Sequence, residues 1–385
     1  MTAICLYLQI HQPFRLRRYS VFDSDSDYFD SQLNSRYMQA IAHRSYLPAA
    51  RTLLELARRF KGAFRFAISV TGTAMEQFAL YAPEVLTILQ ELAATNCVEF
   101  LSETYHHSLA GLYSPEEFRQ QIKLHRQMIK KHFGQTPRVF RNTNLIYSNE
   151  VSRLLGPLKL DGVIAEGWEG VLGSRPPTLV YQAPRENLKL LLRHYHLSDD
   201  ISLRFANHSW IQWPLTADKY ASWLHGLNGK GDYCLLGMDI ESFGERWPAH
   251  TGIFDFLFAL PGHVLSLGDV FKTPSEIIET YAAVAELSIP RNISWTDTSR
   301  DLSPWLGNAM QANALQEIFR LEESIKLRDD TALLSDWRRL TTSDHFFYMN
   351  TRLAEYGTFS IYESPYDAYM NYMSVLDNLA ARTRP

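Results

Sequence analysis

Short apolar runs recur along this chain, and each one leads directly into a polar or acidic segment. Seven can be read, at residues 3–10, 64–70, 98–101, 138–140, 162–165, 188–192 and 233–238. Stretches with helical periodicity, such as residues 48–60, separate several of them. Strands and helices in alternation, with polar groups at the carboxyl ends of the strands, are typical of a parallel β/α barrel, although an open doubly wound sheet shows the same alternation. No glycine-rich phosphate loop follows the first run, which argues against nucleotide binding.

The seventh run ends in a dense group of chemically useful residues. Asp239 and Glu241 are two positions apart, so their side chains point the same way if the backbone stays extended. Phe243 and Trp247 follow closely and supply flat apolar rings. Carboxylates for proton transfer beside rings for the apolar face of a pyranose suit a sugar-binding site. A solvated strand-to-loop junction with a satisfied acidic pair explains this stretch equally well.

The character of the sequence changes after about residue 267, where helical signals dominate. Residues 273–276 read as a capping box, and Ser303 with Pro304 opens a long amphipathic pattern. No linker rich in proline, glycine or serine separates this part from the apolar runs. We therefore expect a barrel domain of the catalytic type over residues 1–272 and, over residues 273–385, a helical region that packs on the barrel.

Composition restricts the partners and the compartment. The 385 residues carry a net charge of −4, which argues against a nucleic-acid partner and against an anionic membrane surface. The three cysteines, Cys5, Cys97 and Cys234, lie in apolar runs without metal-ligand spacing, which favours a reducing cytoplasm. Residues 1–14 lack the basic start and long apolar core of a signal peptide, and no apolar segment reaches membrane-spanning length. The sequence leaves the oligomeric state open.

Four stretches together resemble the first four motifs of glycoside hydrolase family 57, in its α-amylase-like branch. They are His11-Gln12-Pro13, residues 98–99 with 105–109, residues 140–147 and residues 238–245, and weaker similarities include Ser343-Asp344-His345. They occur in order over nearly the whole chain. The resemblance implies an α/β fold, namely an incomplete, seven-stranded parallel β/α barrel followed by helices. It also implies a retaining reaction on an α-glucan or maltooligosaccharide, with no cofactor and no metal.

Two catalytic positions follow from the resemblance. Asp239 matches the general acid/base, whereas Asn144 stands where the family has its nucleophilic glutamate. A retaining glycosidase needs a second carboxylate, roughly 5 Å from the first, to attack the anomeric carbon. A neutral amide is a poor nucleophile, although it still exchanges hydrogen bonds with a sugar. We therefore expect glucan binding with impaired catalysis. Two further departures are Gln9 and Arg246, where many members have histidine.

The remaining candidates are expected to bind substrate, because they lie in the motifs or directly follow an apolar run. They are His11, Glu99, His107, Arg141, Glu166, Trp168, Asp200, Glu241, Phe243 and Trp247. Of these, His11, His107, Glu166 and Asp200 are expected to converge with Asn144 and Asp239 on one mouth of the barrel. Glu166 is the nearest candidate for a substitute carboxylate. The tryptophans at 210, 213 and 223 are more typical of a core.

Three functions are consistent with these residues. The first is an α-glucan hydrolase or glucanotransferase with an altered nucleophile arrangement, and the second is a non-catalytic glucan-binding or regulatory protein on the same scaffold. A metal-dependent polysaccharide deacetylase is the least favoured, because no His-x-x-x-His pattern occurs. His194 and His196, two apart on an expected strand, are a weak metal signal by themselves.

Overall fold

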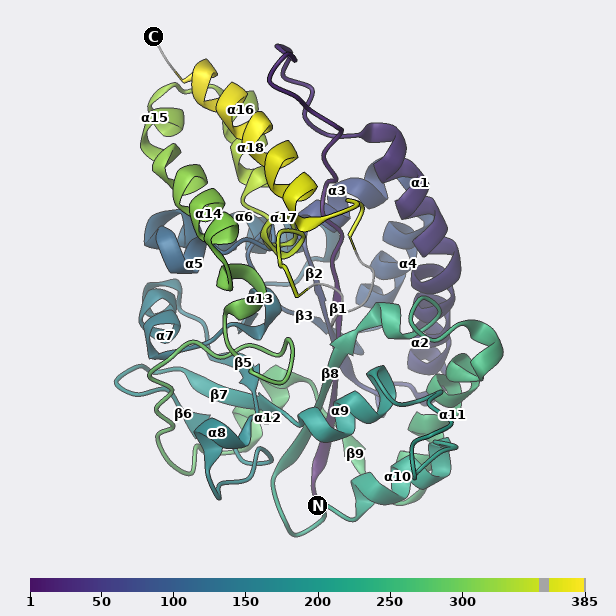
Figure 1. Cartoon of the computed structure of the whole chain (residues 1–385). Helices are drawn as coiled ribbons and strands as arrows, with labels where there is room; N and C mark the ends of the chain where they lie inside the picture. Colours follow the sequence, from purple (N-terminus) through teal and green to yellow (C-terminus); the bar gives the residue numbers. More distant parts are fainter. Residues whose placement is uncertain (353–359, 384–385) are drawn as a thin grey trace.

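The computed structural model describes residues 1–352 and 360–383, and a curved parallel sheet forms its centre (Figure 1). Seven parallel strands lie in the order β3-β2-β1-β8-β7-β5-β4. Their bounds are β1 Ala3–Ile10, β2 Phe66–Val70, β3 Val98–Phe100, β4 Val139–Arg141, β5 Gly162–Glu166, β7 Lys189–Arg193 and β8 Tyr233–Asp239. The two end strands approach each other where Ser102 bridges to Phe140. This arrangement confirms the predicted incomplete, seven-stranded barrel.

Two short strands extend the sheet. β6 (Tyr181–Gln182) pairs antiparallel with β7, and β9 (Val270–Phe271) pairs parallel with the first two residues of β1. Every residue of β1 is buried, as expected of a parallel strand covered on both faces. β1 and β8 are in register from Ala3 opposite Tyr233 to Gln9 opposite Asp239. Gln9 and Asp239 therefore lie at the carboxyl end of the barrel, and β9 marks the amino end.

Helices cover the outside of the sheet. The longer ones in the first two thirds of the chain are α1 (Ser31–Ile41), α2 (Leu47–Phe60), α3 (Gly72–Tyr81), α4 (Pro83–Ala94), α6 (Pro115–Phe133), α9 (Tyr195–Ser202), α10 (Ala217–His225) and α11 (Ile253–Ser266). Apolar side chains of α2, α4, α10 and α11 pack with one face of β1, β2 and β8 in a single large core. The carboxyl ends of the strands therefore form a rigid rim around the mouth of the barrel.

The C-terminal helices form a separate apolar cluster. α14 (Ala309–Arg320), α16 (Thr331–Leu340) and α18 (Pro365–Arg382) lie side by side above the barrel (Figure 1). The shorter helices α13 (Ser303–Leu306), α15 (Glu322–Leu327) and α17 (Ser343–Phe347) lie close to them. The predicted capping box at Thr273 is confirmed at the start of α12 (Pro274–Thr280). Ile277 and Ile278 of α12 pack into the barrel core, so this helix belongs physically with the strands. The division of the chain at residue 272 stays a prediction.

None of the helices in the described ranges combines the length and the apolar character that crossing a bilayer demands.

Candidate functional site

Asp239 is the last residue of β8 and opens the mouth of the barrel. The expectation that the backbone stays extended through Glu241 is wrong, because residues 240–242 form a 3-10 turn. The two carboxylates still interact, since burial and, after it, the charge of Asp239 raise the pKa of Glu241 to about 8. Burial also raises the pKa of Asp239, against the opposing effect of Arg141, Arg246 and Arg193. Two acids that retain protons more strongly than usual are suited to proton donation near neutral pH.

Glu241 is held in place by a chain of hydrogen bonds that begins in the first motif. The Tyr46 hydroxyl donates to Glu241 Oε1 over 2.5 Å, and Gln12 Nε2 donates to the Tyr46 oxygen over 3.0 Å. Arg15 Nη2 in turn donates to Gln12 Oε1 over 2.8 Å. Successive donors of this kind fix the carboxyl group of Glu241 relative to Asp239.

Asn144 lies on the wall formed by β4 and the helical region. Its backbone is left-handed, with φ 50° and ψ 30°, a conformation that asparagine adopts more readily than most residues. Asn144 Nδ2 donates to Ser343 Oγ over 3.3 Å, and Asn144 Oδ1 accepts from Trp295 Nε1 over 3.4 Å. The amide of Asn144 also lies close enough to the His107 ring to influence its pKa. Asn144 is thereby held between the barrel and the loop and helix that follow it in the chain.

Two stacked histidines lie beside Asn144. The rings of His11 and His107 are 4.0 Å apart at an angle of 22°. His11 bonds to Asp344 Oδ2 over 2.9 Å through Nε2 and to Thr71 through Nδ1. Burial, then the neighbouring charge of His11, lower the pKa of His107 well below its usual range. Burial acts to raise the pKa of Asp344, but the neighbouring His11 outweighs it and holds that pKa well below the usual range of a carboxyl group. His107 is therefore neutral and Asp344 ionised near neutral pH.

Arg141 contributes buried hydrogen-bond donors close to Asn144 and Trp295. It is fully buried on β4, its Nε donates to the Tyr7 hydroxyl over 2.6 Å, and its guanidinium lies 4.9 Å from the ring centre of Trp295. Among the described residues Nη1 and Nη2 have no hydrogen-bond partner, and the closest anion, Glu103, is 3.8 Å from Nη1. Buried donors without partners are rare in folded proteins, and a bound ligand is one explanation for them.

The six residues expected at one mouth all lie at or after the carboxyl ends of strands. His11, His107, Asn144 and Asp239 are linked through ring stacking, hydrogen bonds and the electrostatic influence of His11 on Asp239. Glu166 ends β5, and Asp200 lies on α9 after β7. Arginines bind both of these carboxylates, and Arg193, which binds Glu166, also influences Asp239.

Glu166 is enclosed by cations. Arg193 Nη1 and Arg300 Nη1 each approach Glu166 Oε2 to 3.0 Å, and Arg193 Nη2 donates to Asp199 over 2.5 Å. Burial raises the pKa of Glu166, and the two guanidinium groups oppose that shift. Asp200 is likewise paired, with Arg204 Nε donating over 2.8 Å. A carboxylate saturated by two arginines is not available as a nucleophile, so the structure corrects the expectation that Glu166 could replace the missing one.

The sequence profile of "Glycosyl hydrolase family 57" matches residues 5–290. The chain belongs to glycosyl hydrolase family 57. A protein of Methanocaldococcus jannaschii named "Putative alpha-amylase" is 36% identical over 392 residues, which cover 97% of this chain and 83% of that protein. A family 57 branching enzyme from Thermococcus kodakaraensis superposes with a TM-score of 0.72 at 15% identity, over 99% of this chain and 90% of the other. The alpha-amylase AmyC from Thermotoga maritima gives 0.64 at 13% identity, over 100% and 94%.

Three residues of the family 57 mouth were not assigned from the sequence. Glu103 is fully buried, accepts from Ser69 Oγ over 2.6 Å and lies 3.3 Å from His107 Nδ1. Asp344 and Trp295 reach the site from beyond the matched barrel. Glu103 directly follows an apolar run and Asp344 lies in a motif-like triplet, so both had a usable signal. Trp295 had none.

Glu99 and Phe243 do not lie at the mouth. Glu99 pairs with the second residue of β2, and Ser275 at the start of α12 donates to both its oxygens. That contact places Glu99 toward the amino end of the barrel, away from Asp239. Phe243 is 1% exposed and belongs to the apolar core, so its ring offers no face to a sugar.

Trp168 and Trp247 remain possible sugar platforms. Trp168 is partly exposed directly after Glu166 and Gly167, and its ring lies over the position where Gly170 lacks a side chain. Trp247 is also partly exposed, and its Nε1 donates to the Ile201 carbonyl over 2.8 Å. Both rings are therefore held at the rim with part of their surface open.

The pair His194 and His196 does not lie on a strand as expected. His194 caps the start of α9, and His196 bonds to Glu169 over 2.9 Å. Across the described ranges no group of three or more His, Cys, Asp or Glu side chains is arranged to hold a metal ion.

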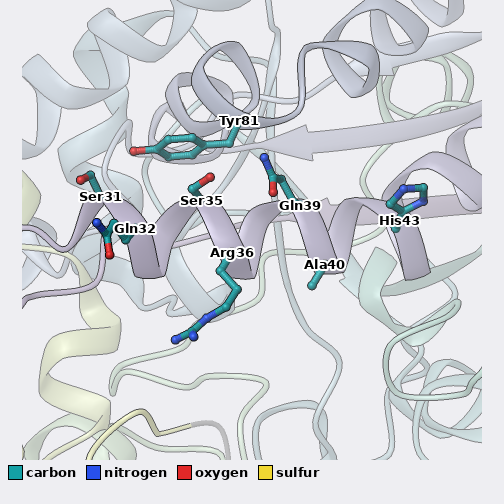
Figure 2. Close-up of a pocket in the computed structure, with 8 residues that line it drawn as sticks. All are labelled: Ser31, Gln32, Ser35, Arg36, Gln39, Ala40, His43 and Tyr81. Carbon is teal, nitrogen blue, oxygen red and sulfur yellow. The ribbon is translucent and has the colours of Figure 1, made fainter.

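A surface hollow of about 660 Å³ lies outside this site, along α1 (Figure 2). Tyr81 of α3 lies on the side of α1 from which Ser35 extends, whereas Arg36 and Ala40 extend from the opposite side of α1 (Figure 2). Its side chains are largely exposed, and it includes none of the mouth residues.

Proposed function

We propose that this family 57 chain binds α-glucans at the mouth around Asp239, and that its covalent step is impaired because Asn144 occupies the nucleophile position. The observation that carries the proposal is the pairing of a proton-retaining carboxyl, Asp239, with an amide where a second carboxylate is required. Asp239 would protonate the leaving glycosidic oxygen. The Asn144 amide cannot form a stable glycosyl ester or balance an oxocarbenium-like charge.

Binding is supported by the donors and faces that remain. The Nη1 and Nη2 atoms of Arg141, which hydrogen-bond to none of the described residues, offer hydrogen bonds to sugar hydroxyls, as do the Asn144 amide and the neutral His107 ring. Trp247 offers an open ring at the rim. A neutral sugar has no charge to pair with the protein and few groups that anchor it. We therefore expect dissociation constants between roughly micromolar and millimolar.

A second candidate is a slow but active hydrolase or glucanotransferase, and one observation favours it. Asp344 is an ionised carboxylate one hydrogen bond from Ser343, which itself bonds to Asn144. It could supply the negative charge that Asn144 lacks. Its oxygen is already engaged by His11, so we rank this candidate second.

The setting of the proposed function is the cytoplasm, without a nucleic-acid partner. Cys5, Cys97 and Cys234 are buried free thiols, which supports a reducing compartment. The net charge of −4 supports neutral rather than polyanionic ligands.

Calorimetry with maltoheptaose tests the binding proposal. We expect a weak exothermic isotherm with the wild-type chain and none with cellohexaose, a β-linked control of similar size. Asp239→Asn should retain binding, because its amide keeps the hydrogen-bonding shape of the carboxyl group. Absence of heat and of competition with every α-glucan would contradict the proposal.

A further inference from the structure

A second hollow lies outside the mouth, on the side of the barrel covered by α10 and α11. Its volume is about 760 Å³, within the range of roughly 300–1,000 Å³ that small-molecule sites occupy. These two helices pack against each other beside α9 (Figure 1). The loop 203–216, between α9 and α10, supplies much of the lining.

The hollow has an apolar floor, one aromatic wall and a polar rim. Phe205, Leu215 and Phe256 form the floor and are buried. Trp213 is 42% exposed, and His208 stacks on it with ring centres 4.2 Å apart. Trp213 was expected in the core, and its position on the surface is a correction. Trp210 and Trp223, by contrast, pack against the apolar core.

The rim indicates a neutral ligand rich in hydroxyl groups. It is formed by Thr216, His250, Asp255 and His263, which are exposed and can each exchange hydrogen bonds with a hydroxyl. Among the described residues that line this hollow there is no lysine or arginine, so an anionic ligand would find no fixed positive partner. An open indole face beside such groups suits the C–H face of a pyranose, because the face of the ring is electron-rich.

One end of the hollow lies near the mouth. α11 follows β8, so Gly252 and the amino end of α11 lie near the carboxyl end of that strand, and from there the hollow runs along α11 to His263. Ile201 of α9 accepts the hydrogen bond of Trp247, and Phe205 lies one turn further along the chain. A glucan long enough to leave the mouth past Trp247 would run toward this hollow.

We propose that the hollow walled by Trp213 is an accessory binding site for α-glucan chains, separate from the mouth. The inference rests on the proposed function, since it takes the same class of ligand. The site holds a segment of a long glucan and raises the affinity of the protein for polymers over that for short oligosaccharides. Linking two weak sites through one ligand increases total affinity without any new contact at the mouth.

Affinity electrophoresis in native gels that contain glycogen tests the site. Trp213→Ala should weaken retention roughly 2- to 12-fold, the range expected for loss of one aromatic partner. Trp213→Phe should keep most of it, because a flat ring remains. Ile211→Ala is the matched control, since Ile211 lies on the same loop, is 90% exposed and does not line the hollow. His263→Ala, on α11, provides a second lining variant that leaves the loop intact.

Calorimetry with maltotriose separates this inference from the proposed function. Maltotriose is too short to span both sites, and its binding at the mouth should be unchanged in Trp213→Ala and weakened in Trp247→Ala. If wild type binds maltotriose but all the hollow variants retain glycogen like Ile211→Ala, the accessory site is refuted alone. If glycogen retention depends on Trp213 while maltotriose never binds, the mouth proposal fails instead. If wild type neither binds maltotriose nor is retained by glycogen, both proposals are refuted.

Discussion

Two groups of acids stand at the same end of the barrel and differ in how their charge is balanced. Asp239 acts on Glu241 electrostatically, a tyrosine hydroxyl donates to Glu241, and burial raises the pKa of both acids. Glu166 and Asp199 are instead bound directly by Arg193 and Arg300. Burial raises the pKa of Glu166 as well, so the difference lies in the contacts: the second group is held inside a closed network with two arginines. A carboxylate at the end of a strand is therefore a candidate acid only if no cation saturates it.

The largest effect on stability should come from breaking the closed network. Glu166→Gln leaves two buried guanidinium groups without their shared anion, and loss of one member of a buried ion pair costs about 3–5 kcal/mol. Glu150→Gln is the matched control, because Glu150 pairs with Arg153 at the exposed surface, where such pairs contribute about 0–1 kcal/mol. Urea unfolding followed by circular dichroism measures both. Equal stability of the two variants would show that the network is not the structural element described here.

The acid pair should show itself in the pH dependence of stability. Because the pKa of Glu241 is raised in the folded state to about 8, the folded chain retains a proton that the unfolded chain releases. The free energy of unfolding should therefore fall as the pH rises from about 5 to about 8.

Glu241→Gln should remove this part of the pH dependence. Between pH 5 and pH 8 wild type should lose on the order of 1–3 kcal/mol more stability than Glu241→Gln, and Glu150→Gln should behave as wild type does. Urea titrations at pH 5, 6, 7 and 8 provide the comparison. A wild-type curve parallel to that of Glu241→Gln would mean that the carboxyl titrates normally.

The smallest effect concerns the Trp247 ring. Trp247→Ala should weaken maltoheptaose binding by about 1 kcal/mol, or roughly fivefold, if the open part of the indole stacks on a sugar. Trp247→Phe removes the hydrogen bond to Ile201 but retains a flat ring, and should bind almost as wild type does. Calorimetry of the three proteins decides, and an unchanged affinity for Trp247→Ala would make Trp247 a structural residue.

The sequence predicts the fold because each strand has a local signal, namely a short apolar run that leads into polar residues. Apolar runs of the length of β1 and β8, with helices between them, leave few alternatives to a parallel sheet. It also predicts His11, Asn144 and Asp239 at one mouth, because each directly follows the carboxyl end of a strand. These are statements about neighbours along the chain.

The contacts that the sequence could not predict join distant positions. Glu166 follows a strand as Asp239 does, but one of its cations, Arg300, is 134 positions away. Asp344 reaches His11 across 333 positions, and Trp295 reaches Asn144 across 151. Glu99 was misplaced because its strand continues past it toward Glu103, so that Glu99 lies near the start of the strand and not at its end. Such errors arise wherever function depends on tertiary partners.

The central claim is that the mouth retains its acid and lacks its nucleophile, and Asn144→Glu tests it most directly. The longer carboxylate restores an anion that can attack the anomeric carbon. A left-handed backbone at position 144 makes the change cost about 1–2 kcal/mol, since glutamate tolerates that conformation less well than asparagine. Asn144→Gln is the matched control, with the same length and no charge.

The measurement is the rate of hydrolysis of an activated aryl maltooligosaccharide, with the anomer of the first product followed by NMR. We predict that Asn144→Glu is at least roughly 100-fold faster than wild type and releases the α-anomer, that Asn144→Gln stays as slow as wild type, and that Asp239→Asn abolishes the gain. A wild-type chain already as fast as Asn144→Glu would contradict the account, because another residue would then be the nucleophile.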